Sequence, residues 1–260
     1  MAGRIEFITP EGLRIDGRRS NEVRRIQCKL GVLPGSDGSA SFQMGNTIAI
    51  ASVYGPHEAL AGRKGFSQPQ NDAGATVTCE YTVSGFSTRD HRRRIRDRNT
   101  TETAQAIAQV MSAVIQTSLL PKTSTIGITI TIVQEDGGAK ACAMNAATLA
   151  LVDAGIPMID VLCCCAAGCI DEVPILDMNH QEEVSGCADV PLAQLARTGR
   201  IALLQMDSKL PLNVFKETVA LASAGCTMVY KEMVSAMKLY VAQTLEKRGS
   251  VSNVAELFLN

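Results

Sequence analysis

Alternating apolar and polar residues predict strands in both halves of the chain. Isoleucine alternates with glycine or threonine over residues 126–132, a period of two that is typical of a strand with one buried face. Two strand-like runs, 39–44 and 48–53, flank Gly45-Asn46-Thr47, and a Gly-Asn pair at such a junction indicates a hairpin turn. Further strands are predicted at 24–32, 76–83, 161–170, 190–195 and 201–206.

Helices are predicted where apolar residues recur every three or four positions. The first begins at Thr100 or Thr101 and is expected to stop at Pro121. A second helix is predicted over residues 141–154, before a Gly that is typical of a helix end. The third, long or broken, is expected from residue 212 to about residue 247.

The order of these elements predicts an α+β fold. Strands precede a helix twice along the chain, and hairpin-like strands before each helix favour two pseudo-repeated halves over a doubly wound sheet. We therefore expect one domain over residues 1–260, with pseudo-repeats at about 20–120 and 125–247.

Composition and charge narrow the possible functions. Hydrophobic residues make up 46% of the chain, enough for a substantial core. Aromatic residues make up only 4% and tryptophan is absent, so an aromatic platform that stacks RNA bases is not expected. Because the net charge is −1, any contact with nucleic acid must come from a local basic patch.

The cysteines predict neither a disulfide framework nor a zinc site. There are nine, an odd number, and Cys163-Cys164-Cys165 lies in an apolar run where cysteine acts as a small hydrophobe. No Cys-x-x-Cys pair occurs, so we expect reduced core cysteines in a cytosolic or nuclear protein. The amino-terminal residues show no signal peptide, and no run of about 18 apolar residues predicts a membrane span.

Residues 89–98 form the basic patch of the chain. They hold six arginines and two aspartates, a net charge of +4 if His91 is neutral. Each contact between such a cation and an RNA phosphate releases counterions, which makes the segment a candidate for RNA binding. The alternatives are a solvated loop or a latch onto an acidic neighbour.

Several short signatures occur together in a characteristic order. They are Arg14-Ile15-Asp16-Gly17-Arg18-Arg19, Asp37-Gly38-Ser39-Ala40, Gly45-Asn46-Thr47, Tyr54-Gly55-Pro56, Asp136-Gly137-Gly138, Asn145-Ala146-Ala147-Thr148-Leu149-Ala150 and Asp153-Ala154-Gly155-Ile156-Pro157-Met158. The ordered set resembles the RNase PH family. Within that family the chain resembles the exosome ring subunits that are phosphorolytic in archaeal exosomes.

The resemblance implies the RNase PH fold, which is the ribosomal protein S5 domain 2-like fold of two βαβα halves. It implies a hetero-hexameric ring with other RNase PH-type exosome subunits, S1/KH cap subunits and a separate hydrolytic nuclease. Single-stranded RNA would pass through the central pore for 3′→5′ processing and degradation. The expected location is the nucleus, including the nucleolus, and the cytoplasm, with no membrane partner.

Active relatives cleave RNA from its 3′ end with inorganic phosphate, and here the phosphate loop departs from their pattern. They follow Asp-Gly-Gly with a hydroxyl residue, an arginine and a second hydroxyl residue. This chain keeps Gly137 and Gly138 but continues with alanine, Lys140 and alanine, so a point charge replaces a bidentate donor. Asn99 stands where the resemblance predicts a second phosphate-binding arginine. The glycines and the helix amino terminus could still bind an anion weakly.

The acidic pair of the family is altered as well. Relatives carry two aspartates six residues apart, where this chain has Asp177 and Glu183. Glutamate adds a methylene, and a displacement of about 1 Å can cost roughly 100-fold in rate. We therefore expect Asp177 and Glu183 to be relics of the family's catalytic positions. No catalytic residue, cofactor or metal is expected. The alternative is an active phosphorolytic exoribonuclease that uses Lys140, Arg98 and Asp177, and Mg²⁺ is expected only in that case. A third, remote hypothesis is an unrelated small-molecule enzyme on this fold.

The resemblance also suggests which cations contact RNA, because the matching segment of relatives lines the pore. Arg98 matches an RNA-contacting arginine, and the loop that holds Arg63 and Lys64 lies where relatives narrow the pore. The remaining candidates are Arg89, Arg92, Arg93, Arg94 and Arg96.

Overall fold

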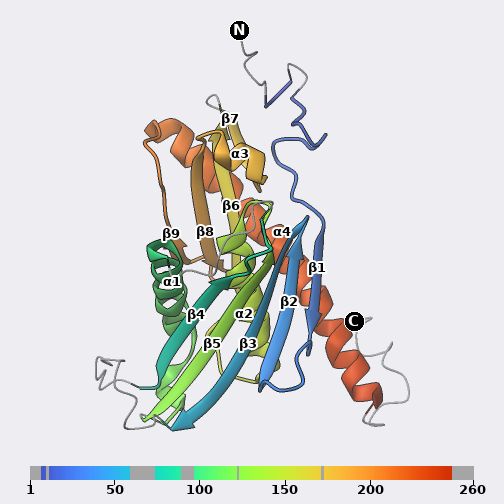
Figure 1. Ribbon diagram of the computed structural model, residues 1–260, viewed down its shortest axis with the longest axis vertical. Helices are drawn as coiled ribbons and strands as arrows, with labels where there is room; N and C mark the ends of the chain where they lie inside the picture. Colours follow the sequence, from blue (N-terminus) through green and yellow to red (C-terminus); the bar gives the residue numbers. More distant parts are fainter. Residues whose placement is uncertain are drawn as a thin grey trace.

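The computed structural model describes residues 7–9, 12–58, 74–88, 97–121, 123–170 and 173–247. Two sheets lie one above the other along the long axis, with helices between and beside them, so the predicted α+β class is confirmed (Figure 1). The elements are β1 Ile26–Leu30, β2 Gly38–Met44, β3 Thr47–Glu58, β4 Thr76–Val83, α1 Arg98–Val114, a 3₁₀ turn Thr117–Leu119, β5 Ser124–Gln134, α2 Ala139–Asp153, β6 Leu162–Ile170, β7 Val173–Leu176, α3 His180–Val184, β8 Ala188–Leu195, β9 Ile201–Leu204 and α4 Leu212–Lys247.

The first sheet has five strands in the order β1-β2-β3-β5-β4. The predicted hairpin is confirmed: Met44 pairs with Thr47, and Gly45 between them has φ +62°, a left-handed conformation that favours glycine. β3 continues to Glu58 rather than ending at Tyr54-Gly55-Pro56, because a shift of register beyond Tyr54 lets the pairing with β5 resume.

β5 belongs to this first sheet, where it pairs with β3 and β4. Residues 124–134 open the expected second repeat, so the division between the sheets does not follow the expected repeats at 20–120 and 125–247. The four strands of the second sheet, in the order β7-β6-β8-β9, all come from residues beyond α2.

β6 explains the unbroken apolar run of the sequence. All nine of its residues are buried, because it pairs on both edges and is covered by α2 and α4. Cys163, Cys164 and Cys165 lie within it as part of the core, and burial raises the pKa of each thiol.

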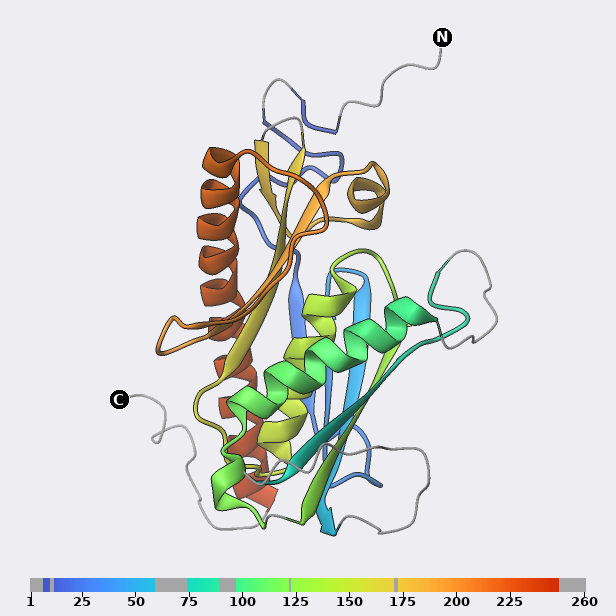
Figure 2. The ribbon, with the colours of Figure 1, turned by 90° about the vertical axis from the view of Figure 1, so that its left-hand side faces the viewer.

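α2 is the central helix and packs against strands of both sheets (Figure 2). Residues 141–151 are all buried, and alanine at five of these positions lets the backbone approach closely. At Gly38 a Cβ atom would lie 2.4 Å from the carbonyl oxygen of Ala150, so β2 meets the end of α2 at a point where only glycine fits. α4 spans both sheets along its length (Figures 1 and 2).

Helix α1 is shorter than its apolar spacing predicted. It ends at Val114, and Ile115 becomes extended and forms an isolated bridge with Met158. The two short elements β7 and α3 were not predicted. In the part of the chain that the structure describes, no helix is long and apolar enough to cross a membrane.

Candidate functional site

The two glycines of the loop before α2 have a left-handed backbone. Gly137 and Gly138 have φ values of +81° and +65°, which residues with a side chain rarely adopt. A Cβ atom on Gly137 would lie 2.4 Å from the carbonyl oxygen of Met178. The loop is therefore in direct contact with the segment that carries Asp177 and Glu183.

Asp177 is fully buried in an ion pair with Arg24. Its Oδ1 accepts a hydrogen bond from Arg24 Nη2 at 2.7 Å, and its Oδ2 accepts from Arg24 Nε at 2.9 Å and from the Arg24 backbone N–H at 2.8 Å. Arg24 Nη2 also donates to the carbonyl oxygen of Gly137 at 3.0 Å. One arginine thus ties the carboxylate to the glycine loop, and solvent reaches neither oxygen of Asp177.

The amino-terminal signature holds the same segment from the other side. Arg14 pairs with buried Glu182 and donates to the carbonyl oxygen of Asp177 at 2.9 Å. Arg18 donates to Asn179 Oδ1 at 3.0 Å. Two arginines of this signature, Arg14 and Arg18, therefore hold residues 176–182 in place, a role that the sequence did not predict.

Glu183 reaches the amino end of α2. Its Oε1 accepts a hydrogen bond from the Gly138 N–H at 2.7 Å. Burial raises the pKa of Glu183, and the bond from Gly138 partly offsets that rise. The acidic pair therefore lies beside the glycine loop, but both carboxylates are engaged by groups of the chain itself.

Asp189 in β8 joins this site, and sequence reasoning missed it. Burial and the charge of Glu183 raise its pKa to about 7, while Lys140 acts in the opposite direction. Its Oδ1 is buried and has no hydrogen-bond partner among the described residues. An aspartate directly before the predicted strand 190–195 was the signal that could have found it.

Arg98 and Asn99 lie in the first turn of α1. The Arg98 side chain is 88% exposed and donates from Nε to Glu102 Oε1 at 2.8 Å. No hydrogen bond or ion pair joins either residue to the described loop 136–140. The amide of Glu135 donates to the carbonyl oxygen of Ser87, which places Ser87 next to the loop.

The remaining RNA-binding candidates lie outside the described residues. They are Arg63, Lys64, Arg89, Arg92, Arg93, Arg94 and Arg96. Their predicted role therefore stays a prediction.

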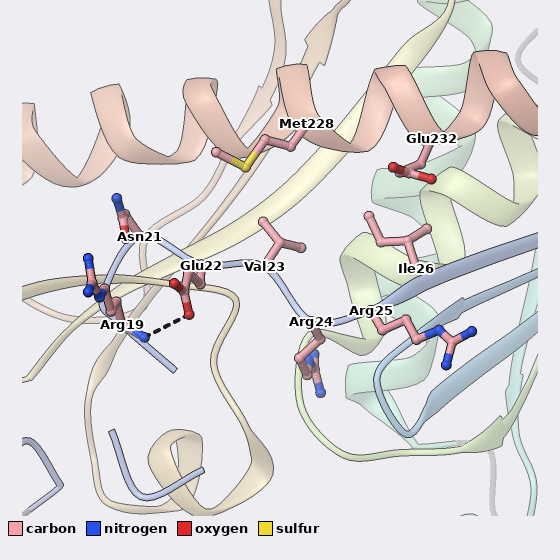
Figure 3. A pocket seen from close by; sticks show the side chains of 9 residues that line it. All are labelled: Arg19, Asn21, Glu22, Val23, Arg24, Arg25, Ile26, Met228 and Glu232. Atoms are coloured by element: carbon pink, nitrogen blue, oxygen red, sulfur yellow. Dashed lines mark hydrogen bonds between the residues drawn. The ribbon is translucent and has the colours of Figure 1, made fainter. Parts of the chain in front are cut away.

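A separate groove of about 660 Å³ lies between residues 19–26 and α4. Figure 3 shows Met228 and Glu232 of α4 above Val23 and Ile26, while the Arg24 side chain points away from the helix. The groove thus lies on the opposite side of this segment from the glycine loop. No group of three His, Cys, Asp or Glu side chains within the described ranges could hold a metal ion.

Comparisons with known proteins agree with this architecture. Profiles of domains 1 and 2 of the RNase PH 3′ exoribonuclease family match residues 22–157 and 160–225. The exosome complex component RRP41 homolog of Arabidopsis thaliana is 47% identical over 225 residues, which cover 86% of this chain and 91% of that protein. Exosome complex component Rrp41 of Methanopyrus kandleri is 38% identical, with 89% and 95% covered.

A solved structure shares the fold. A chain of the Archaeoglobus fulgidus exosome, described with RNA bound to the active site, superposes with a TM-score of 0.73 at 17% identity and covers 85% of this chain and 93% of that chain. With two profiles that span residues 22–225 and relatives that match most of its length, the chain belongs to the RNase PH family of 3′ exoribonucleases and has exosome Rrp41 components among its homologues.

Proposed function

We propose that the chain is a non-catalytic ring subunit of an RNA exosome that guides RNA 3′ ends through the ring. The relatives in Arabidopsis and Methanopyrus are named as exosome components, and the Archaeoglobus exosome chain shares the fold. The proposed partners are other RNase PH-type subunits in a hetero-hexameric ring, S1/KH caps, a separate hydrolytic nuclease and single-stranded RNA. The proposed location is the nucleus, nucleolus and cytoplasm.

The burial of Asp177 is the observation that carries the absence of catalysis. A general acid must come within hydrogen-bond reach of the leaving oxygen. Both oxygens of Asp177 are instead held by Arg24, and the side chain is inaccessible to solvent. Lys140 and Asn99 replace the expected arginines, so the attacking phosphate also lacks two guanidinium partners.

Retention of the site's outline favours one second candidate, an active phosphorolytic exoribonuclease. Gly137, Gly138, Lys140 and the acidic pair still lie around one loop. In that case the reaction would release nucleoside diphosphates and would use Mg²⁺; the leading proposal needs no cofactor.

Arg98 provides a test of RNA guidance. Arg98→Ala in a reconstituted ring is expected to weaken RNA binding and to lower the salt dependence of binding by about one phosphate contact. Stability should barely change, because the pair with Glu102 is exposed. Binding is measured by fluorescence anisotropy at several salt concentrations.

Matched variants separate guidance from catalysis. Lys216→Ala removes an exposed cation of α4 and is expected to leave RNA binding unchanged. Lys140→Ala is expected to leave RNA decay by the ring with its hydrolytic nuclease unchanged. A ring in which Arg98→Ala binds RNA like the wild type, or in which Lys140→Ala slows decay, would contradict the proposal.

A further inference from the structure

The amino end of α2 is electropositive because of the geometry of the helix. The first N–H groups of a helix have no partner inside the helix, and the aligned peptide dipoles place a partial positive charge there. Such ends bind phosphate and carboxylate groups. In this chain the left-handed Gly138 turns its N–H toward Glu183, whose Oε1 lies 2.7 Å away. One of the N–H groups at this end of the helix, that of Gly138, therefore already donates to an anion of the chain itself.

Glu183 is held in place by a rigid support. It lies in α3, whose first turn is closed by reciprocal hydrogen bonds between Asn179 and Glu182. Glu182 in turn forms the buried ion pair with Arg14. An aspartate at position 183 would be shorter by one carbon–carbon bond, about 1.5 Å, and would not reach Gly138 from this backbone without movement.

The charges around the loop also disfavour a second anion. The charge of Lys140, a residue of the loop, lowers the pKa of Asp189. The charges of Glu183 and Asp207 raise that pKa. The charge of Glu135 likewise raises the pKa of Glu183. An incoming orthophosphate would therefore meet the carboxylates of Glu183 and Asp189, while Arg24, the other cation at the loop, is already paired with Asp177.

From this geometry we propose that Glu183 is an internal substitute for inorganic phosphate, which fills the α2 amino terminus and closes the glycine loop to the free ion. The inference deepens the proposed function, since it states why a phosphate would not bind. It also differs from the sequence expectation of weak anion binding at Gly137 and Gly138, which stays a prediction, because the Gly138 N–H already donates to Glu183.

The test measures binding of inorganic phosphate to the full-length protein by isothermal titration calorimetry. Glu183→Ala is expected to bind phosphate at least about tenfold more tightly than the wild type. Glu217→Ala removes an exposed carboxylate of α4 and serves as the control for net charge, with no expected gain. Equal phosphate affinity in wild type and Glu183→Ala, or no binding by a folded Glu183→Ala protein, would overturn the inference.

A second variant covers the case in which Glu183→Ala does not fold. Glu183→Gln keeps the size and an oxygen that accepts from Gly138 but loses the charge, so a smaller gain in phosphate affinity is expected. The Gly138 amide resonance should shift on addition of phosphate in Glu183→Gln and stay fixed in the wild type. A shift of the same size in both proteins would refute the proposal.

Nucleoside diphosphate release separates this inference from the proposed function. If the wild-type chain binds phosphate at this loop but its ring releases no nucleoside diphosphates, the inference fails and the proposed function stands. If the wild-type ring does release them through this chain, both fail, because phosphorolysis requires bound phosphate.

Discussion

At the scale of single residues, the buried ion pair of Arg24 and Asp177 dominates the site. Burial lowers the pKa of Arg24, but its hydrogen bonds and attraction to Asp177 outweigh that effect and raise the pKa overall. A buried pair of this kind contributes specificity more than net stability, yet removal of one partner leaves an uncompensated charge in the interior. The pair therefore joins distant segments of the chain whether or not any reaction takes place there.

Asp177→Asn is expected to lower the free energy of unfolding by about 3–5 kcal/mol, because Arg24 keeps its charge in the interior without a counter-ion. Urea denaturation followed by circular dichroism measures the change. Glu102→Gln breaks an exposed ion pair and should cost no more than about 1 kcal/mol. Equal costs for the two variants would mean that the Asp177 carboxylate is not buried in an ion pair.

Asp189 gives the site a distinct dependence of stability on pH. Its pKa is raised to about 7 in the folded protein from its ordinary value of 3.8, so the folded state holds a proton more tightly than the unfolded state. Its contribution to stability is therefore fully present below about pH 4 and is lost as the pH rises to about 7.

Asp189→Asn removes this dependence because the amide does not ionise. The variant is expected to be more stable than the wild type at pH 8, by at most about 4 kcal/mol. The difference should shrink toward zero as the pH falls to about 4. Thermal denaturation at pH 4, 6 and 8 measures it, and a difference that is independent of pH would contradict the assignment.

At the scale of elements, α2 joins the two sheets and carries the glycine loop at its amino end. Its packing depends on close approach, because small residues line it and β2 begins against its carboxyl end. Ser39 N–H donates to Asp153 Oδ2 at 2.9 Å at the same contact. A shift of α2 at this end would be transmitted along a rigid helix to Gly138 at the other.

Gly38→Ala is expected to destabilise the protein by about 1–3 kcal/mol, because its Cβ would overlap the backbone of Ala150 and Ala154. Gly35→Ala is the matched control in the preceding turn, since a Cβ atom there meets nothing within 4 Å. Its effect should stay within about 0.5 kcal/mol. Similar losses for both variants in urea denaturation would show that β2 does not meet α2 at Gly38.

At the scale of the whole molecule, local sequence patterns predicted most of the elements. Alternation identified β2, β3 and β5, and the apolar run of residues 161–170 identified β6. Membership of the sheets was less accessible, because the pairing of β5 with β3 and β4 depends on contacts between segments far apart in the chain. β7 and α3 are too short for a periodic pattern to identify them.

The candidate site, too, could be predicted from the sequence only in part. The resemblance to the family assigned Asp177, Glu183 and the two glycines to one site, and the structure brings these residues together. Arg14 and Arg24 could not be assigned from sequence, because their carboxylate partners lie more than 150 residues away. Asp189 was missed for a related reason, since its altered pKa arises only from burial beside Glu183.

The most direct test of the central claim is the release of nucleoside diphosphates from polyadenylate by a reconstituted ring that contains this chain and lacks the hydrolytic nuclease. Adding orthophosphate is expected to produce no release above background, because Asp177 is inaccessible and Glu183 occupies the Gly138 N–H. Phosphate-dependent release that is abolished by Lys140→Ala would contradict the account.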